Sequence, residues 1–227
     1  MITQQQQQIQ QFIDYCEAHL DFTEPDPNGY QSAPLCALDS LFSGNARYGA
    51  VVNMMERMKV FLGVQDITMA TTTTSEMIAL IIDTPDDDLA ANLMTKNKVS
   101  YSGQKILKVT AYKMLLKVLQ VCGVETRENI WENAENRILK EKMMKVPGIG
   151  MVLLDYFFIL SGMKNYVKDD VHIQRFINNA ISMNAFTHND RVDLIRKTAH
   201  IMSTSNHSGM TPRHLDHIIW IYQSNRK

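Results

Sequence analysis

The sequence KVPGIG at residues 145–150, followed by MVLLDYFFIL at 151–160, decides how this chain is expected to fold. A proline and two glycines one residue apart favour a sharp turn, and the nearly continuous apolar run after them favours a buried helix. Gly148 and Gly150 let the backbone expose successive N–H groups at the start of that helix, where an anion such as a phosphate oxygen can bind. Lys145 can add a positive charge toward the same anion. Residues 146–150 are called the glycine turn below.

A pair of carboxylates follows about twenty residues after the glycine turn. Asp169 and Asp170 precede a helical segment that carries His172 and Arg175. A helix start favours an ionised carboxylate, because the N-terminal end of the helix dipole is positive. An Asp at this position is commonly no more than an N-cap, and a Pro-Gly turn between two helices is common as well. The two features together, at this spacing, are much rarer than either feature alone.

Helical periodicity dominates the rest of the chain. Pro34 and Thr126 are typical of helix starts. Ser102 is predicted to cap a long helix that continues to Leu119, and only residues 65–74 resemble a strand. We therefore predict an all-α fold of about ten helices in two helical lobes, forming a single domain over residues 1–227.

The bulk properties exclude several classes of protein. The chain has 227 residues and a formal net charge of −1, so any nucleic-acid contact must come from local clusters of Lys and Arg. The cysteines at 16, 36 and 122 lack the number and spacing of a disulfide framework, a zinc site or an iron–sulfur cluster, and we expect buried reduced thiols. No leader segment is recognisable, and the apolar run at 151–160 is too short to cross a bilayer. We expect a soluble monomer, cytoplasmic or nuclear, with no membrane partner and no metal site.

The two segments together resemble the helix-hairpin-helix DNA glycosylase superfamily, which includes endonuclease III and the 8-oxoguanine glycosylases. The family's hairpin has the form Leu-Pro-Gly-Val-Gly, to which VPGIG at 146–150 is similar, and Asp170-Val171-His172 is similar to the family's Asp-Val-His. The resemblance implies that Asp170 is the catalytic carboxylate. It also implies that the hairpin binds the DNA backbone, here through Lys145, Gly148, Ile149 and Gly150. A monovalent cation often bridges hairpin and phosphate in this family.

The resemblance extends more loosely over residues 34–196. Asn45 takes the position of the residue that fills the gap left by a flipped base, and Lys105 falls in register with a lysine of the family's following long helix. Tyr48, Asp155 and His172 are candidates for the base pocket, although a histidine there more often packs against its helix. Weaker pocket candidates are Asp39, His214, His217 and Trp220.

One departure from the family decides the expected mechanism. Members that also cleave the strand place a lysine two residues after the second hairpin glycine, where its amine attacks the sugar. This chain has Val152 at that position, flanked by Met151 and Leu153. We therefore expect a monofunctional glycosylase that uses water as the nucleophile and leaves an abasic site. The four-cysteine iron–sulfur loop of some members is absent, and we expect no cofactor requirement.

Several alternatives stay open at this point. The expected partner is double-stranded DNA with a damaged or modified base, and that base could be a repair lesion or a modified base of phage DNA. A second hypothesis is a catalytically inactive helix-hairpin-helix DNA-binding protein, which the missing lysine and the near-neutral charge fit. A third is a helical protein without a role on DNA, in which the glycine turn is purely structural.

Overall fold

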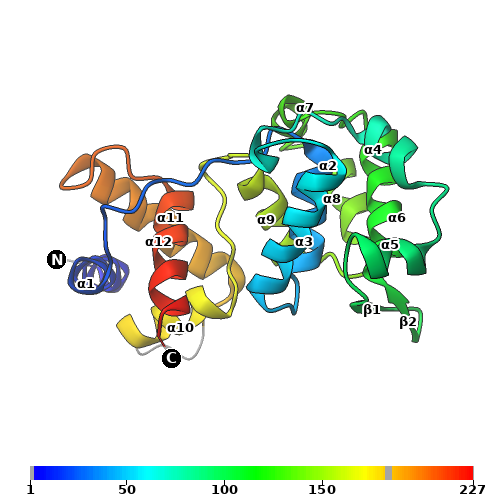
Figure 1. The fold of residues 1–227 in the computed structure, drawn as a ribbon. Helices are drawn as coiled ribbons and strands as arrows, with labels where there is room; N and C mark the ends of the chain where they lie inside the picture. Colours follow the sequence, from blue (N-terminus) through cyan, green and yellow to red (C-terminus); the bar gives the residue numbers. More distant parts are fainter. Residues whose placement is uncertain (1–2, 182–185, 227) are drawn as a thin grey trace. The chain divides into compact units, whose positions relative to one another are not determined.

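The computed structural model describes residues 3–181 and 186–226, and the chain divides into two compact units (Figure 1). Unit 1 comprises residues 1–27 and 163–227, and unit 2 comprises residues 28–162. The described residues form twelve α-helices, one short 3₁₀ helix and two short strands. The all-α prediction is therefore confirmed in its main feature, with more helices than expected and a small antiparallel hairpin.

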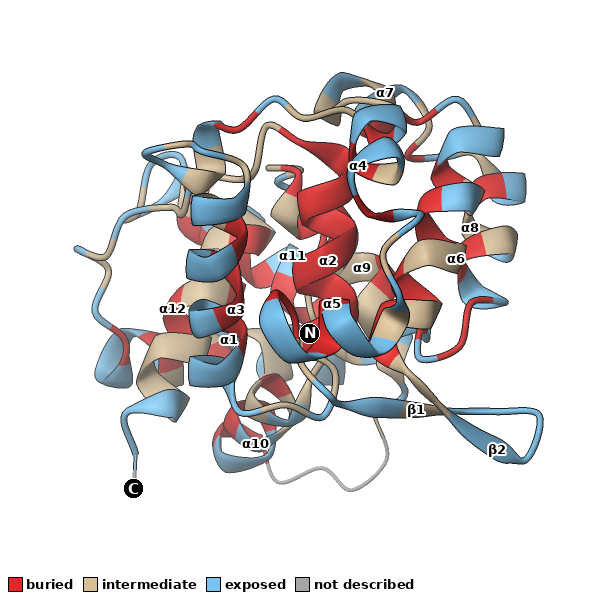
Figure 2. Ribbon diagram, turned by 45° about the vertical axis from the view of Figure 1, so that its right-hand side comes forward, coloured by how far each residue is buried: buried red, intermediate tan, exposed pale blue. Residues whose placement is uncertain are grey.

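Unit 2 is built around a central helix. Its elements in chain order are α2 (Ala33–Ser43), α3 (Tyr48–Phe61), η1 (Ile67–Met69), α4 (Thr74–Ile81), α5 (Asp86–Asn92), β1 (Lys98–Tyr101), β2 (Gln104–Leu107), α6 (Lys108–Val121), α7 (Arg127–Glu132), α8 (Arg137–Met144) and α9 (Met151–Leu160). Helix α2 is buried from Ala33 to Phe42 and packs against α9, α6, α3 and α4 (Figure 2). Its all-round apolar surface is typical of a helix enclosed by others. Pro34 stands in its first turn, as predicted, and Gly44 follows its last residue.

The strands lie where the sequence predicted the start of a helix. Ser102 and Gly103 have φ of 47° and 79°, and they join β1 to β2 in an antiparallel hairpin. Two-residue hairpin turns of this kind require positive φ at both positions. The prediction that Ser102 caps a helix was therefore wrong: α6 begins at Lys108, and Lys105 lies on β2. Residues 65–74, predicted to be the most strand-like, instead contain the 3₁₀ helix η1, which Asp66 caps.

Unit 1 packs four helices around its own core. They are α1 (Gln4–His19), α10 (Val171–Ala180), α11 (His188–Thr204) and α12 (Pro212–Ser224). Phe12, Phe176, Ile195 and Ile219 are among the buried side chains that the four helices contribute to this core. Thr187 and Asp190 form a capping box at the start of α11, in which Thr187 is the N-cap residue.

The two ends of unit 2 lie against each other. The backbone N–H of Tyr30 donates a hydrogen bond to the carbonyl of Leu160 over 2.8 Å. Gly29 is so close to the same segment that a Cβ there would come within 2.6 Å of the backbone N of Gly162. A side chain at Gly29 would therefore push the two ends apart.

The remaining expectations on cysteines and membranes can be compared with the structure. All three cysteines are unpaired, and Cys16 and Cys36 are buried as expected. Cys122 is only half-buried, because it lies at the C-terminal end of α6, so the prediction of three buried thiols was wrong at this position. Among the described residues, no helix has both the length and the apolar character needed to cross a bilayer.

Candidate functional site

The glycine turn joins α8 to α9 in unit 2. Gly148 has φ of 90°, a conformation that L side chains rarely adopt. Pro147 and Ile149 are buried, whereas Gly148 and Gly150 are exposed. The N–H of Ile149 donates to the carbonyl of Val146 over 3.1 Å, which closes the turn. The apolar residues thus anchor the turn while both glycines face solvent.

Among the described residues, no acceptor binds the N–H groups of Gly150 and Met151 at the start of α9. Gly150 is its N-cap residue and supplies no side-chain acceptor, and no acidic residue stands in the first turn. The first N–H groups of a helix have no partner inside the helix, so an external acceptor can use them. Because the N–H of Ile149 is already bonded, the N–H groups at Gly150 and Met151 are better placed for an anion. Lys145, exposed at the end of α8, adds a positive charge beside the turn.

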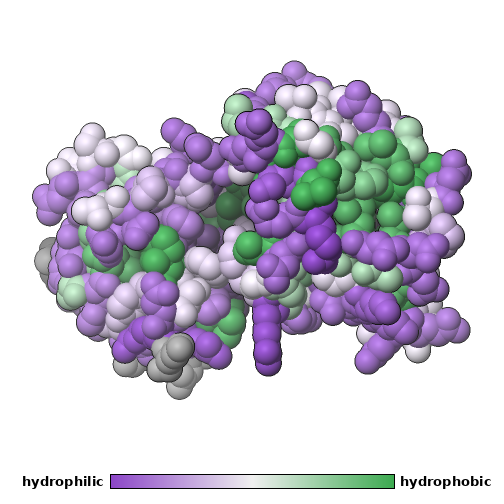
Figure 3. All heavy atoms as spheres, in the orientation of Figure 1, coloured by the Kyte–Doolittle hydropathy of each residue, from purple (hydrophilic) through white to green (hydrophobic). Residues whose placement is uncertain are grey.

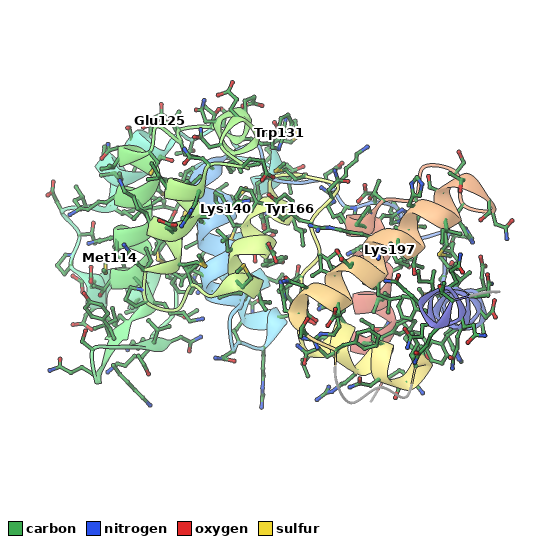
Figure 4. The ribbon with its side chains drawn as sticks, turned by 180° about the vertical axis from the view of Figure 1, so that it is seen from behind. Met114, Glu125, Trp131, Lys140, Tyr166 and Lys197 are labelled. Atoms are coloured by element: carbon green, nitrogen blue, oxygen red, sulfur yellow. The ribbon has the colours of Figure 1, made fainter. Side chains whose placement is uncertain are left out.

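The side chain of Lys140 helps to hold α8 against α9. Nζ of Lys140 lies 5.6 Å from the centroid of the Phe158 ring, and it also pairs with Glu135 over 3.6 Å (Figure 4). A cation over an aromatic face adds to the apolar packing of Leu139 and Met143, which are fully buried. The two helices therefore hold the glycine turn from both sides.

The two glycines should respond differently to alanine. At Gly148 a Cβ would lie 2.8 Å from Cγ1 of Val99 and 3.2 Å from Cδ1 of Leu41, at a φ that disfavours L residues. We expect Gly148→Ala to lower the free energy of unfolding by about 1–3 kcal/mol. At Gly150 a Cβ meets nothing within 4 Å and φ is −115°, so Gly150→Ala is the matched control and should change stability by less than about 1 kcal/mol. Urea unfolding of both variants measures the difference, and equal losses would contradict the strained geometry at Gly148.

The loop between α2 and α3 carries Asn45, exposed and with φ of 53°. Lys108 is buried and its Nζ donates to the carbonyls of Leu41, Phe42 and Gly44 over 2.9, 3.2 and 2.6 Å. Burial lowers the pKa of Lys108 to about 8, whereas the three carbonyls favour its charged form. The amine of Lys108 thus caps the C-terminal end of α2 and fixes the backbone at Gly44, which precedes Asn45.

The Asn45 loop and the glycine turn lie close together. A Cβ on Gly44 would come within 2.7 Å of Cδ1 of Leu153 in α9, and Leu41 contacts the turn at Gly148. The hydroxyl of Ser40 also donates to the carbonyl of Leu153. Two of the predicted elements, far apart in the sequence, are therefore brought together in unit 2.

Two of the pocket residues predicted for unit 2, Asp39 and Tyr48, lie near each other and near Tyr30. Asp39 is buried and accepts a hydrogen bond from the phenol of Tyr30 over 2.8 Å. Burial and the Asp39 charge raise the pKa of Tyr48, the half-exposed first residue of α3. Burial, and then the same charge, also raises the pKa of Tyr30. Asp155 lies in the middle of α9 and is half-buried.

Asp170 lies in unit 1 as the N-cap of α10. Its Oδ1 accepts hydrogen bonds from the backbone N–H groups of His172 and Ile173 over 2.8 and 3.4 Å. Among the described residues, no donor binds Oδ2, and the residue is half-buried rather than enclosed. One oxygen therefore orients the carboxylate, and the other is left for water or a substrate.

Asp169, next to it, has a different role. It is 1% exposed and forms two hydrogen bonds with the guanidinium of Arg191, over 2.6 and 2.7 Å. Nδ1 of His188 lies 3.0 Å from Oδ2 of the same carboxylate. Sequence reasoning missed both partners, because they lie on α11 and no local pattern connects them with residue 169. Asp169 is thus satisfied within the fold, which leaves Asp170 as the accessible carboxylate.

A third carboxyl group, Asp216 on α12, stands behind this pair. It is buried, and its Oδ1 accepts a hydrogen bond from the backbone N–H of Lys168 over 3.1 Å. Burial raises the pKa of Asp216 well above its usual value, and the charges of Asp170 and Asp169 raise it further. A carboxyl group that stays protonated at Asp216 adds no negative charge beside Asp169 and Asp170.

This raised pKa has a consequence for stability. A carboxyl group whose pKa is higher in the folded state contributes stability below its usual pKa of 3.8, and that contribution is lost as pH rises through the folded-state value. Asp216→Asn removes the titration while keeping an oxygen for the Lys168 N–H. We expect its free energy of unfolding, relative to wild type, to increase with pH above 3.8, by at most about 1.4 kcal/mol per pH unit. Urea unfolding at several pH values tests this, and parallel curves for the two proteins would contradict it.

The histidines predicted for the pocket have mainly structural contacts. The backbone N–H of His172 donates to Asp170, and its ring lies 6.3 Å from that of Trp220. Its Nδ1 is buried without a hydrogen-bond partner among residues 3–181 and 186–226. His214 bonds through Nε2 to the carbonyl of Glu24 over 2.7 Å, and burial lowers the pKa of His217. In the part of the chain that the structure describes, no three His, Cys, Asp or Glu side chains are grouped as metal ligands.

Comparison with known proteins yields one match. A family model described as "Domain of unknown function (DUF8548)" matches residues 8–224, which include all of unit 2 and most of unit 1. No curated protein and no solved structure matches the chain.

Proposed function

The chain belongs to this family of unknown function, DUF8548, and from its own residues we propose that it is a monofunctional DNA glycosylase. Its substrate would be a damaged or modified base in double-stranded DNA, and its product an abasic site. The observation that carries the proposal is the state of Asp170: one oxygen is held by helix N–H groups and the other is open to a substrate. The glycine turn, with an uncapped helix start behind it, supports the DNA-backbone contact.

Asp170 can act on the bond between base and sugar. A base inside a duplex is out of reach, so it must be flipped out of the stack, at a cost of a few kcal/mol. When the N-glycosidic bond breaks, its electron pair leaves with the base and positive charge develops on the sugar. The Asp170 carboxylate would stabilise that charge and orient the attacking water, whose oxygen bonds to C1′ while its proton is released.

The side chains of Val152 and Lys108 do not replace the missing nucleophile. Val152, in the first turn of α9, has no nucleophilic group. The amine of Lys108 is buried and its three N–H groups point at three carbonyls. Hydrolysis without strand cleavage is therefore the reaction we propose.

Incubation with duplexes that each contain one damaged or modified base tests the proposal. We expect strand breaks at one class of base after hot alkali, which cuts abasic sites, and none before it. Breaks without alkali, together with a borohydride-trapped covalent complex, would refute the monofunctional mechanism. An absence of breaks across a broad panel would refute the glycosylase.

The second candidate is a DNA-binding protein without catalysis. The observation that favours it is that Asp170 already serves as the N-cap of α10, a role that needs no chemistry. DNA binding through the glycine turn without base release on any substrate would support this candidate.

A further inference from the structure

The β-hairpin formed by residues 98–107 is the most exposed regular element of unit 2. Figure 2 shows it extending beyond the helices, with most of its length exposed. Lys98 and Lys105 are exposed, and neither forms an ion pair within the described parts of the chain. Tyr101, next to the turn, is 45% exposed. The surface along this margin is mostly hydrophilic, whereas apolar side chains gather near α4 (Figure 3). The exposed side chains of the two strands are available for contact with another molecule.

The hairpin lies in the most basic segment of the chain. No acidic residue occurs between Asp88 and Glu125, whereas this interval contains six lysines, at 96, 98, 105, 108, 113 and 117. Two of them are used internally, because Lys108 binds the end of α2 and Lys113 pairs with Asp86 over 2.9 Å. Lys96, Lys98 and Lys105 give the hairpin and its flank a local positive charge in a chain whose net charge is −1. A polyanion is the partner that this charge fits.

The register of the strands places different groups on the two faces of the hairpin. Lys98 stands opposite Leu107 and Ser100 opposite Lys105, so both lysines share one face. The other face carries Val99, Ile106, Tyr101 and Gln104. Val99 packs at the glycine turn, since a Cβ on Gly148 would come within 2.8 Å of its Cγ1. Tyr101 lies on that same face, two residues farther toward the tip.

We propose that the β-hairpin lies in a groove of the DNA duplex whose backbone is bound at the glycine turn. A two-stranded ribbon fits the major groove, which is about 12 Å wide. The face with Tyr101 and Gln104 is directed to the strand held at the turn, and the face with Lys98 and Lys105 is directed to the phosphates of the opposite strand. This inference rests on the DNA binding of the proposed function and not on base excision.

The salt dependence of DNA binding tests the inference. The probe is a short duplex that contains one uncleavable abasic-site analogue, and the same duplex without it is measured alongside. Each phosphate contact contributes about 0.9 to the slope of log K against log salt, so the double variant Lys98→Gln/Lys105→Gln should reduce the slope by about 1.8.

Lys117→Gln is the matched control, an exposed lysine on α6, about 13 Å along the helix from Lys108. Its slope should equal that of wild type. Tyr101→Ala should weaken binding with an unchanged slope.

The outcomes separate the two proposals. A reduced slope in the double variant but not in Lys117→Gln supports the hairpin contact, whether or not any base is released. If the double variant keeps the wild-type slope of log K against log salt, the proposed hairpin contact is overturned. If the slope is reduced in Lys145→Gln at the same time, binding at the glycine turn is still supported. If the wild-type protein binds neither duplex at low salt, both proposals are overturned.

Discussion

Asp170→Asn is expected to lower the rate of base release by about 10²- to 10⁴-fold. The amide keeps an oxygen that can accept the N–H groups of His172 and Ile173, and Asn caps helices as well as Asp does. The variant should therefore fold and bind DNA as wild type does, while it lacks the negative charge opposite the sugar. The rate is measured in single turnover as alkali-dependent strand breaks on the substrate found in the panel.

Asp190→Asn provides the matched control for this variant. Asp190 also belongs to a helix start in unit 1, where it forms the capping box with Thr187, and it is exposed. Its amide variant should release the base at the wild-type rate. If Asp170→Asn retains that rate too, the carboxylate has no part in the reaction and the cap is its whole role.

Arg191→Ala is expected to lower the free energy of unfolding by about 3 kcal/mol, the largest loss among the charged residues. Its removal leaves the Asp169 carboxylate, 1% exposed, with only His188 beside it. A buried charge that loses its partner has neither water nor a cation to stabilise it. The loss is measured by urea unfolding at neutral pH.

Arg137→Ala is the control for this pair. Nε of Arg137 lies 2.6 Å from Glu141, the same distance as between Arg191 and Asp169, but its side chain is 90% exposed. Solvent screens such a pair, so its loss should change stability by less than about 1 kcal/mol. Similar losses in the two variants would show that the buried pair contributes no more than an exposed one.

The sequence predicted those features of the fold that depend on a few adjacent residues. The glycine turn, helix α9 and the N-cap position of Asp170 follow from a few adjacent residues each: two glycines, an apolar run and a carboxylate before a helix. In the same way, Pro34 predicted the first turn of α2. These features depend on backbone preferences within one or two turns of chain.

Contacts between distant segments could not be predicted in the same way. Arg191 meets Asp169 across 22 residues and Asp216 meets Lys168 across 48, with nothing in either sequence neighbourhood to indicate the pairing. The β-hairpin was missed for another reason. Its strands have four residues each, and its lysines and serine resemble a capped polar helix start until the positive φ of Ser102 and Gly103 is known.

The contact between Gly29 and Gly162 has a consequence for the ancestry and engineering of the chain. Since residues 28–162 begin and end at one place, they form an insertion that interrupts unit 1 at a single point. Modules with adjoining termini are those that tolerate transplantation and circular permutation. A piece of the gene that encodes residues 28–162 could thus be excised, moved or replaced as one cassette, with the glycine turn inside it and the carboxylate of Asp170 outside it.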